Sequence, residues 1–269
     1  MAIKTPNPMI MGVLNVTPDS FSDGGQYLHI ENAIVQAKKL QAQGADIIDV
    51  GGESTRPGAP AVLVDEEIDR VIPAIEALAQ SIDIPISVDT SKTQVMQLAV
   101  EAGASMINDV CALQAPGALE TVSDLGQDIC LMHMQGSPRT MQKDPTYVDV
   151  VDEIKQFFDQ KIEACIKAGI KQDKIILDPG FGFGKTLEHN LDILRRLSEF
   201  ESFGLRILAG MSRKSMIGSM LNDRNIEGRV IGSVASAIIA VQNGANIVRV
   251  HDVLETKDAL MVLQQVRGE

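Results

Sequence analysis

The sequence predicts an α/β fold, a single (β/α)8 TIM barrel that spans residues 1–269. The length is close to the roughly 250 residues of a typical barrel of this kind. Short apolar runs of strand length alternate along the chain with longer segments of helical periodicity. No Pro- or Ser-rich linker divides the chain, and eight such repeats in one domain favour a closed barrel over an open doubly wound sheet.

The eight predicted strands are short, mostly apolar runs. In chain order they cover residues 9–15, 46–51, 85–89, 105–110, 129–134, 174–178, 206–211 and 246–251. The runs 46–51 and 174–178 are apolar almost throughout instead of alternating, which is typical of strands covered on both faces. We therefore expect parallel strands with helices around them.

The helices are predicted in the segments between these strands. Helical periodicity covers residues 30–43, 66–81, 93–102, 148–168, 187–201 and 230–243. Four of these segments are followed by Gly44, Gly103, Gly169 and Gly244, and glycine is favoured after a helix because it adopts the left-handed conformation. A helix, a glycine, a short turn and a strand in succession are typical of an α/β repeat.

Composition excludes several classes of protein. The net charge of −12 argues against nonspecific binding to nucleic acid or to an anionic membrane. Three scattered cysteines (Cys111, Cys130 and Cys165) form no Cys-x-x-Cys pair, so neither a disulfide framework nor a zinc site is indicated. The first residues lack a signal-peptide core, and the longest apolar stretch, around 233–241, is far shorter than the roughly 20 residues of a membrane helix. We expect a cytoplasmic protein.

Polar residues stand at the carboxyl ends of all eight predicted strands, where the active sites of such barrels lie. Because the chain leaves the core there, one or two polar strand ends need no functional explanation, but eight of them do. In chain order these residues are Asn15, Glu53 to Arg56, Asp89, Asn108 with Asp109, His133, Asp178, Ser212 to Ser215, and Arg249 with His251 and Asp252.

The positions of these residues predict the shape of a ligand. Strands seven, eight and one are neighbours in a closed barrel, so Lys214, Arg249, His251 and Asn15 should converge and form an anion site. Strands three, four and six contribute acceptors that need donors from a ligand, because unpaired buried charges are costly. They are Asp89, Asn108 and Asp178. The ligand should have a donor-rich edge at one end and an anionic group at the other.

Two long loops at the same end of the barrel are candidate lids. Residues 17–25 contain Phe21 and Asp23 among turn-forming residues, and residues 51–58 contain Arg56. The alternative is that their glycines and prolines only terminate the strands.

Eight motifs resemble the dihydropteroate synthase family, in the family's order, from Met9 to about His251. They are NVTPDSFSDGG at 15–25, GGESTRPG at 51–58, SVDT at 87–90, INDV at 107–110, MHM at 132–134, DPGFGFGK at 178–185, SRKS at 212–215 and RVH at 249–251. The resemblance implies a transferase of folate biosynthesis that condenses 6-hydroxymethyl-7,8-dihydropterin diphosphate with 4-aminobenzoate to give 7,8-dihydropteroate and diphosphate. It also implies a homodimer that sulfonamides inhibit.

The resemblance further implies which residues serve each substrate. The pterin would contact Asp89, Asn108, Asp178 and Lys214, and the diphosphate would contact Asn15, Thr55, Arg56, Arg249 and His251. Magnesium would sit at Asn15 and arrive with the diphosphate, because one amide is a poor Mg²⁺ site by itself. The aminobenzoate pocket would consist of Phe21, Thr55, Pro57, Phe183, Lys214 and Ser215. Catalysis would use Asp89, Asp23, Lys214 and Arg249 to stabilise the leaving group and the developing methylene cation, without an enzyme nucleophile.

Two other functions are compatible with parts of this pattern. A pterin-binding methyltransferase would share Asp89, Asn108 and Asp178, but it has no use for a diphosphate site. A pterin-binding protein without catalytic activity would lack part of the catalytic set, and none is missing here.

Other signals receive structural interpretations. Residues 180–186 (GFGFGKT) do not match a Walker A loop, because the spacing between the first glycine and Gly-Lys is wrong. His133 could be a site residue or a satisfied core histidine. Lys38-Lys39 and Arg195-Arg196 are expected on solvated helix faces. The segment 230–241 is apolar nearly all round, so its outer face is expected in the homodimer contact.

Overall fold

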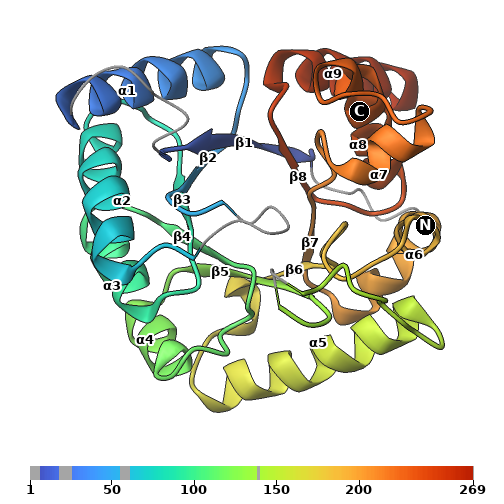
Figure 1. Ribbon diagram of the computed structural model, residues 1–269, viewed down its shortest axis with the longest axis horizontal. Helices are drawn as coiled ribbons and strands as arrows, with labels where there is room; N and C mark the ends of the chain where they lie inside the picture. The colour runs from blue at the N-terminus through green and yellow to red at the C-terminus, as the bar shows by residue number, and fades with distance from the viewer. Residues whose placement is uncertain (1–6, 18–25, 55–60, 138–139, 269) are drawn as a thin grey trace.

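The structure, a computed structural model, describes residues 7–17, 26–54, 61–137 and 140–268, and these form a closed barrel of eight parallel strands (Figure 1). The strands follow one another around the barrel in chain order, and β1 closes it by pairing with β8. They are β1 Met9–Asn15, β2 Ile47–Gly51, β3 Ile86–Asp89, β4 Met106–Asp109, β5 Asp128–Met132, β6 Ile175–Asp178, β7 Arg206–Ala209 and β8 Ile247–Val250. Each overlaps the strand predicted at that place, so the predicted TIM barrel is confirmed.

Helices surround the barrel (Figure 1). They are α1 Gln26–Ala42, α2 Val64–Ala79, α3 Thr93–Glu101, α4 Ala118–Leu125, α5 Val150–Lys167, α6 Leu187–Arg195, α7 Ser215–Met220, α8 Val230–Gln242 and α9 Val253–Arg267, with 3-10 helices η2 Gln172–Lys174, η3 Leu197–Phe203 and η4 Glu227–Arg229. Helices α4, α7 and α9 were not predicted. Helix α7, with six residues, is too short to show a period. Helix α4 has eight residues and buries Ala118 and Val122 on one face, a short period that the sequence reasoning missed. Helix α9 exposes Leu254 and Val262 while it buries Leu260, so its apolar residues do not mark one face.

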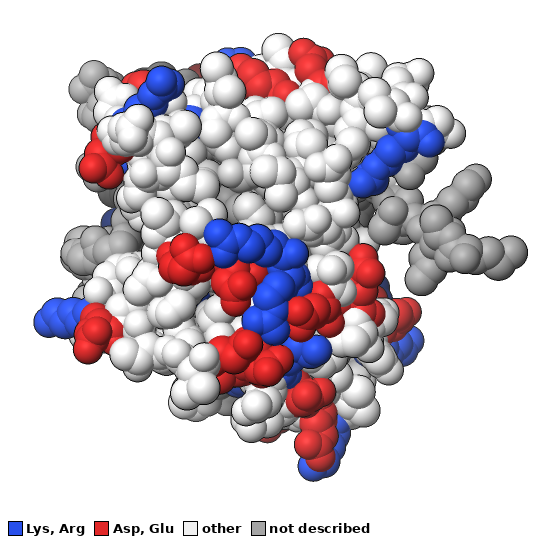
Figure 2. All heavy atoms as spheres, turned by 90° about the vertical axis from the view of Figure 1, so that its right-hand side faces the viewer, with Lys and Arg blue, Asp and Glu red and all other residues white. Residues whose placement is uncertain are grey.

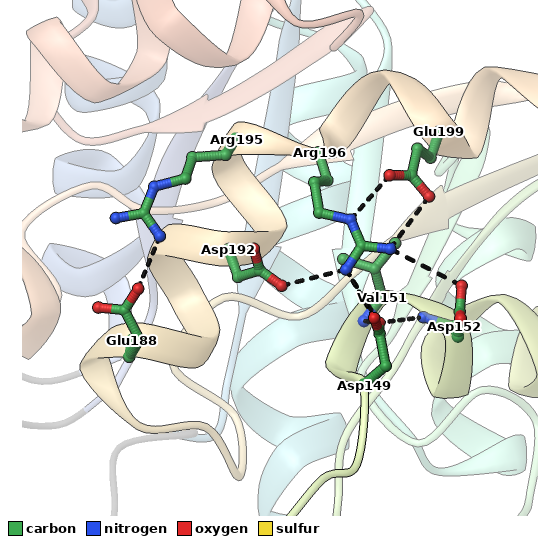
Figure 3. Close-up of polar contacts among 8 residues, drawn as sticks. All are labelled: Asp149, Val151, Asp152, Glu188, Asp192, Arg195, Arg196 and Glu199. Atoms are coloured by element: carbon green, nitrogen blue, oxygen red, sulfur yellow. Dashed lines mark hydrogen bonds and ion pairs between the residues drawn. The ribbon is translucent and has the colours of Figure 1, made fainter.

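The predicted single helix over 187–201 is wrong, because α6 ends at Arg195 and the chain continues as η3. The expectation that Arg195-Arg196 lies on a solvated face holds only for Arg195, which is exposed and paired with Glu188. Arg196 is half-buried, and its guanidinium binds four carboxylates, two from the start of α5, one from α6 and one from η3 (Figure 3). They belong to Asp149, Asp152, Asp192 and Glu199. Because Asp149 also caps α5, Arg196 joins the start of α5 to the end of α6.

The interior of the barrel has an apolar floor below a polar mouth. One core cluster contains only strand residues from inside the barrel, namely Met11, Ile47, Met106, Cys130, Ile176, Leu208 and Ile247. Side chains two residues apart on a strand point to the same side. Asp49, Asn108, Asp178 and Arg249 each follow one of these apolar residues by two positions, so they lie above the floor on the inner side. This alternation explains why a barrel with an apolar interior carries charges at one end.

Among the described residues, no helix combines the length and the apolar character needed to span a bilayer. All three cysteines are free.

Candidate active site

The backbone register brings three predicted site residues to one level of the barrel. Asn15 pairs with Gly51, Gly51 with Asp89, and Asp89 with Asn108. A Cβ added at Gly51 would stand 3.6 Å from the Cβ of Asp89 and 3.7 Å from Oδ1 of Asn15, so the glycine leaves space between them. Asp89 and Asn108 are buried, whereas Asn15 is exposed at the mouth. The accessible amide of Asn15 therefore lies at the same height in the barrel as the buried carboxylate of Asp89.

Arg249 on β8 links this level to a second carboxylate below it. Its Nε donates to Oδ2 of Asp49 over 2.6 Å, and its Nη2 donates to Oδ2 of Asp89 over 2.8 Å. Nδ2 of Asn108 also donates to Oδ2 of Asp49, over 3.2 Å. The sequence reasoning missed Asp49, because it looked for polar residues at strand ends and Asp49 lies inside one. A carboxylate within an otherwise apolar strand was the signal that could have identified it.

Two carboxylates therefore share one guanidinium. Burial raises the pKa of Asp89 to about 7, although Arg249 opposes the rise, and the charge of Asp49 adds to it. Burial lowers the pKa of Arg249, but Asp49 and Asp89 outweigh this effect and raise it above its ordinary value. Arg249 thus remains a cation, while Asp89 can gain or lose a proton near neutral pH.

Asp178 and Lys214 form the opposite side of the mouth. Oδ1 of Asp178 accepts a hydrogen bond of 2.7 Å from the backbone N–H of Gly180. Nζ of Lys214 donates to the carbonyl of Phe181 over 2.7 Å and lies 4.4 Å from the centre of the Phe183 ring. Burial raises the pKa of Asp178 and lowers that of Lys214 to about 8, and each group's charge opposes the other's shift. The pair offers a buried acceptor, a cation and an aromatic face in one place.

Some predicted strand-end residues stabilise turns instead of facing the mouth. The carboxylate of Asp109 accepts from Oγ of Ser91 and from the backbone N–H groups of Cys111 and Leu113, within its own turn. Arg213 pairs with Asp252 and so joins the turn after β7 to the end of β8. These contacts give Asp109 and Asp252 structural roles.

His251 and Ser215 lie near the turn after β7. The backbone N–H of His251 donates to Oγ of Ser212 over 3.1 Å, and its Nδ1 lies 3.0 Å from the same oxygen. Ser215 is the first residue of α7 and is exposed. Five further predicted residues lie outside the described residues: Phe21, Asp23, Thr55, Arg56 and Pro57.

The two interpretations of His133 are resolved by its surroundings. The side chain is buried, and Nζ of Lys185 lies 3.0 Å from its Nδ1. Burial and the charge of Lys185 lower the pKa of His133 to about 2. His133 is therefore a neutral core histidine, and Lys185 is a second buried group that the sequence reasoning missed.

The second loop is anchored at both of its described ends. Lys92 pairs with Glu53 and with Glu67, a fully buried residue of α2, and Oε1 of Glu53 accepts from the backbone N–H of Val62 over 3.3 Å. No sequence signal marked Glu67, which stands in the acidic first turn of its helix.

Nothing in the described part of the chain resembles a preformed metal centre made of three or more His, Cys, Asp or Glu side chains. The exposed amide of Asn15 is a single neutral oxygen ligand. Mg²⁺ is commonly held by one or two protein groups together with substrate phosphates, so this donor fits an ion bound with a phosphorylated substrate.

Comparisons with known proteins agree with this chemistry. The family described as pterin binding enzyme matches residues 11–251. Dihydropteroate synthase of Escherichia coli (strain K12) is 54% identical over 263 residues, which cover 98% of this chain and 93% of that protein. The crystal structure of Yersinia pestis dihydropteroate synthase with a sulfonamide drug has a TM-score of 0.93 and 52% identity, and covers 99% of this chain and 97% of that chain. Xanthomonas albilineans dihydropteroate synthase with 4-aminobenzoic acid has a TM-score of 0.92 and 49% identity, with 98% and 94% covered.

Proposed function

The chain belongs to the dihydropteroate synthase family of pterin-binding enzymes, and on that premise we propose which of its residues carry out each part of the reaction. It condenses 6-hydroxymethyl-7,8-dihydropterin diphosphate with 4-aminobenzoate to give 7,8-dihydropteroate and diphosphate. The observation that carries this function is the barrel mouth, where the Arg249 cluster faces Asp178 and Lys214. The relatives named above are synthases, which decides against the methyltransferase and the non-catalytic alternatives.

The pterin ring is proposed to lie against Asp178, Asn108, Asp89 and Lys214. A pterin edge is a row of N–H donors, and the buried carboxylate of Asp178 is an acceptor whose burial favours a partner with donors. Lys214, within electrostatic reach of Asp178, favours the ionised form of that carboxylate. The amide of Asn108 lies on the same level as Asp89 and can add both a donor and an acceptor.

The diphosphate is proposed to bind at Arg249, His251 and Asn15, together with Thr55 and Arg56. The guanidinium of Arg249 stays charged, and 20% of the side chain is exposed, which suits an anion arriving from the mouth. Mg²⁺ is proposed at Asn15, with the remaining ligands supplied by the substrate and water. When bound, the ion would supply positive charge to the leaving diphosphate.

4-Aminobenzoate is proposed to bind over Phe183 and Ser215, with Phe21, Thr55 and Pro57 from the two loops. Phe183 offers a nearly buried ring, and Lys214 above it can attract the substrate carboxylate. The Yersinia pestis relative has been solved with a sulfonamide drug. We propose that sulfonamides compete with 4-aminobenzoate at this place.

The reaction needs no enzyme nucleophile. The bond between the pterin methylene carbon and the diphosphate oxygen breaks with its electron pair going to diphosphate, the amine nitrogen forms the new bond, and the nitrogen then loses one proton. Arg249 would stabilise the negative charge of the leaving group. Asp89 and Asp23 would stabilise the positive charge that develops at the carbon, and Lys214 would hold the ring.

The function is tested by diphosphate release from the pterin diphosphate in the presence of Mg²⁺, with and without 4-aminobenzoate. We expect release only with the amine, and a loss of release when EDTA removes the Mg²⁺. Tight pterin binding without amine-dependent release would contradict the synthase activity. Release that EDTA leaves unchanged would contradict the Mg²⁺ proposal alone.

We propose that the protein is a homodimer that associates through the side formed by α7, α8 and α9. Ile231 and Ile239 on α8 are exposed, with 81% of Ile231 accessible. Figure 2 shows this side of the barrel, where charged side chains gather in the lower part of the view and the area above them carries few. An exposed apolar helix face of this kind favours burial against a second copy.

Replacing Ile231 by Asp should weaken the dimer at least tenfold, about 1.4 kcal/mol, because a charge would enter an apolar contact. Analytical ultracentrifugation over a range of protein concentrations measures the change. Val35→Asp is the matched control, because Val35 is 67% exposed on α1, away from this side. A monomeric wild type, or the same dimer constant for both variants, would rule out this interface.

We further propose that residues 1–269 form one barrel domain that works in the cytoplasm. The pairing of β1 with β8 supports the single domain, because it joins the two ends of the chain in one sheet. The three free cysteines support a reducing compartment.

A further inference from the structure

We propose that Lys185 is a positioning residue of the active site: its ammonium, enclosed by the turn between β6 and α6, holds Asp178 and Phe183 in the places where the two substrates bind. The inference rests on the proposed function, which assigns Asp178 to the pterin and Phe183 to 4-aminobenzoate. It concerns a residue that lines neither site.

The ammonium of Lys185 is surrounded by acceptors. Its Nζ lies 2.9 Å from the carbonyl oxygen of Gly180, 3.0 Å from that of Phe183, 3.2 Å from that of His133 and 3.0 Å from Nδ1 of His133. Only 3% of the residue is exposed. Burial lowers the pKa of Lys185 well below its ordinary value, and the charge of Asp178 opposes this shift. Three carbonyl oxygens, which can only accept, surround the nitrogen and favour the protonated form with its three N–H groups. Among the described residues, no carboxylate lies within ion-pair distance of it.

The turn itself depends on side chains to satisfy its backbone. Its segment 180–184 has five successive carbonyls, and each accepts a hydrogen bond from a side chain. The donors are Lys185 for Gly180 and Phe183, Lys214 for Phe181, Gln142 for Gly182 and Tyr147 for Gly184. Only Lys185 serves two of these carbonyls and also binds the neighbouring strand end. It therefore fixes the turn from inside.

The turn is also pressed against the segment that follows β5. Gly180 and Gly184 have positive φ angles of 73° and 61°. A Cβ at Gly180 would stand 1.9 Å from the carbonyl oxygen of His133, and one at Gly184 would stand 2.4 Å from that of Gln135. The glycines allow the turn to approach the segment after β5 closely, and Lys185 joins the two by donating to the same His133 carbonyl. Its ammonium consequently points into the protein, unlike a phosphate-binding lysine.

Both substrate contacts depend on this turn. The N–H of Gly180 donates to Oδ1 of Asp178, and the ring of Phe183 lies below Lys214. Without the ammonium, the carbonyl of Gly180 would keep only the backbone N–H of Phe183 as a donor. The buried carbonyl of Phe183 would lose its side-chain donor, and a buried carbonyl without a donor is costly. The turn would then rearrange, and Asp178 and Phe183 would move with it.

Lys185 also acts on Asp178 through charge. Burial raises the pKa of Asp178, whereas the charges of Lys214, Lys185 and Arg249 each lower it. The charge of Asp178 in turn raises the pKa of Cys130 on β5. Loss of the Lys185 charge should therefore raise the pKa of Asp178. Because pterin binding needs the carboxylate, binding would then be lost at a higher pH than in the wild type.

The experiment compares Lys185→Met with the wild type in steady-state kinetics and in calorimetric titration of the pterin diphosphate across pH. For Lys185→Met we expect KM values for both substrates to be at least tenfold higher. We also expect the acid limb of pterin binding, the pH range in which affinity is lost as the pH falls, to move to higher pH. Tyr147→Phe is the matched control, since it removes one hydrogen bond from the same turn without removing a charge, and its acid limb should coincide with that of the wild type. Unchanged KM values and an unchanged acid limb in Lys185→Met would overturn the proposal.

If Lys185→Met does not fold, Lys185→Gln provides the same test, because its amide can still donate to two carbonyls but has no charge. We expect it to displace the acid limb with smaller KM changes, and wild-type behaviour in both measurements would again overturn the proposal. The wild-type assay separates the two hypotheses. An inactive wild type contradicts the proposed function, whereas an active wild type with an indifferent Lys185 contradicts only the positioning role.

Discussion

Arg249→Ala should lower kcat/KM for the pterin diphosphate about a hundred- to a thousandfold, while affinity for the free pterin falls much less. The guanidinium is proposed to stabilise the charge of the leaving diphosphate, and a pterin without diphosphate has no such charge. Arg249 also joins Asp49 to Asp89, so its removal leaves two buried carboxylates without their cation. Asp89 would then hold its proton at neutral pH and could not stabilise a developing cation.

The variant should also be less stable, because breaking a buried ion pair costs about 3–5 kcal/mol, and a half-buried partner favours the lower end. Binding should therefore be measured by calorimetry well below the melting temperature, with the pterin and its diphosphate titrated separately. Arg213→Ala is a suitable control, because it removes another guanidinium paired with a carboxylate at this end of the barrel. Equal losses of affinity for both ligands in Arg249→Ala would place the anion site elsewhere.

The pH dependence of the reaction should report the ionisation of Asp89. Burial raises its pKa to about 7, opposed by Arg249 and increased by Asp49. The carboxylate form is the one that can stabilise a cation, so kcat/KM should fall about tenfold for each pH unit below this value and level off above it. Asp89→Asn should lose this limb and remain at a low rate throughout. What dependence is left in the variant reports the other groups that titrate, including the diphosphate.

The raised pKa of Asp89 makes activity increase with pH, but it makes the stability of the folded protein decrease with pH. The pKa of Asp89 in the folded protein lies above its ordinary value of 3.8, so folding favours the protonated form. This contribution to the free energy of unfolding is fully present below pH 3.8 and is lost as the pH rises through about 7. Denaturant titrations of the wild type and of Asp89→Asn at several pH values measure the difference. A stability difference that does not change with pH would contradict the raised pKa.

The sequence by itself determined the barrel, because its signals are local. Runs of strand length, helical periodicity and glycines such as Gly103 and Gly169 after helices are properties of short segments, and each predicted strand overlaps an observed one. The position of the site followed from one rule of this fold, since polar residues such as Asp89 and Asp178 stand where strands end. The family resemblance added roles, and full-length relatives support it.

Only the tertiary structure decided which charges are buried together. Asp49 and Arg249 are 200 residues apart in the sequence, and their pairing exists only because the barrel closes. Lys185, Glu67 and Arg196 look like surface residues in their own segments, but each is bound by groups from other elements. The reason is physical: a periodic pattern fixes which way a side chain points, whereas the cost of burying its charge depends on partners that the folded chain brings from far away.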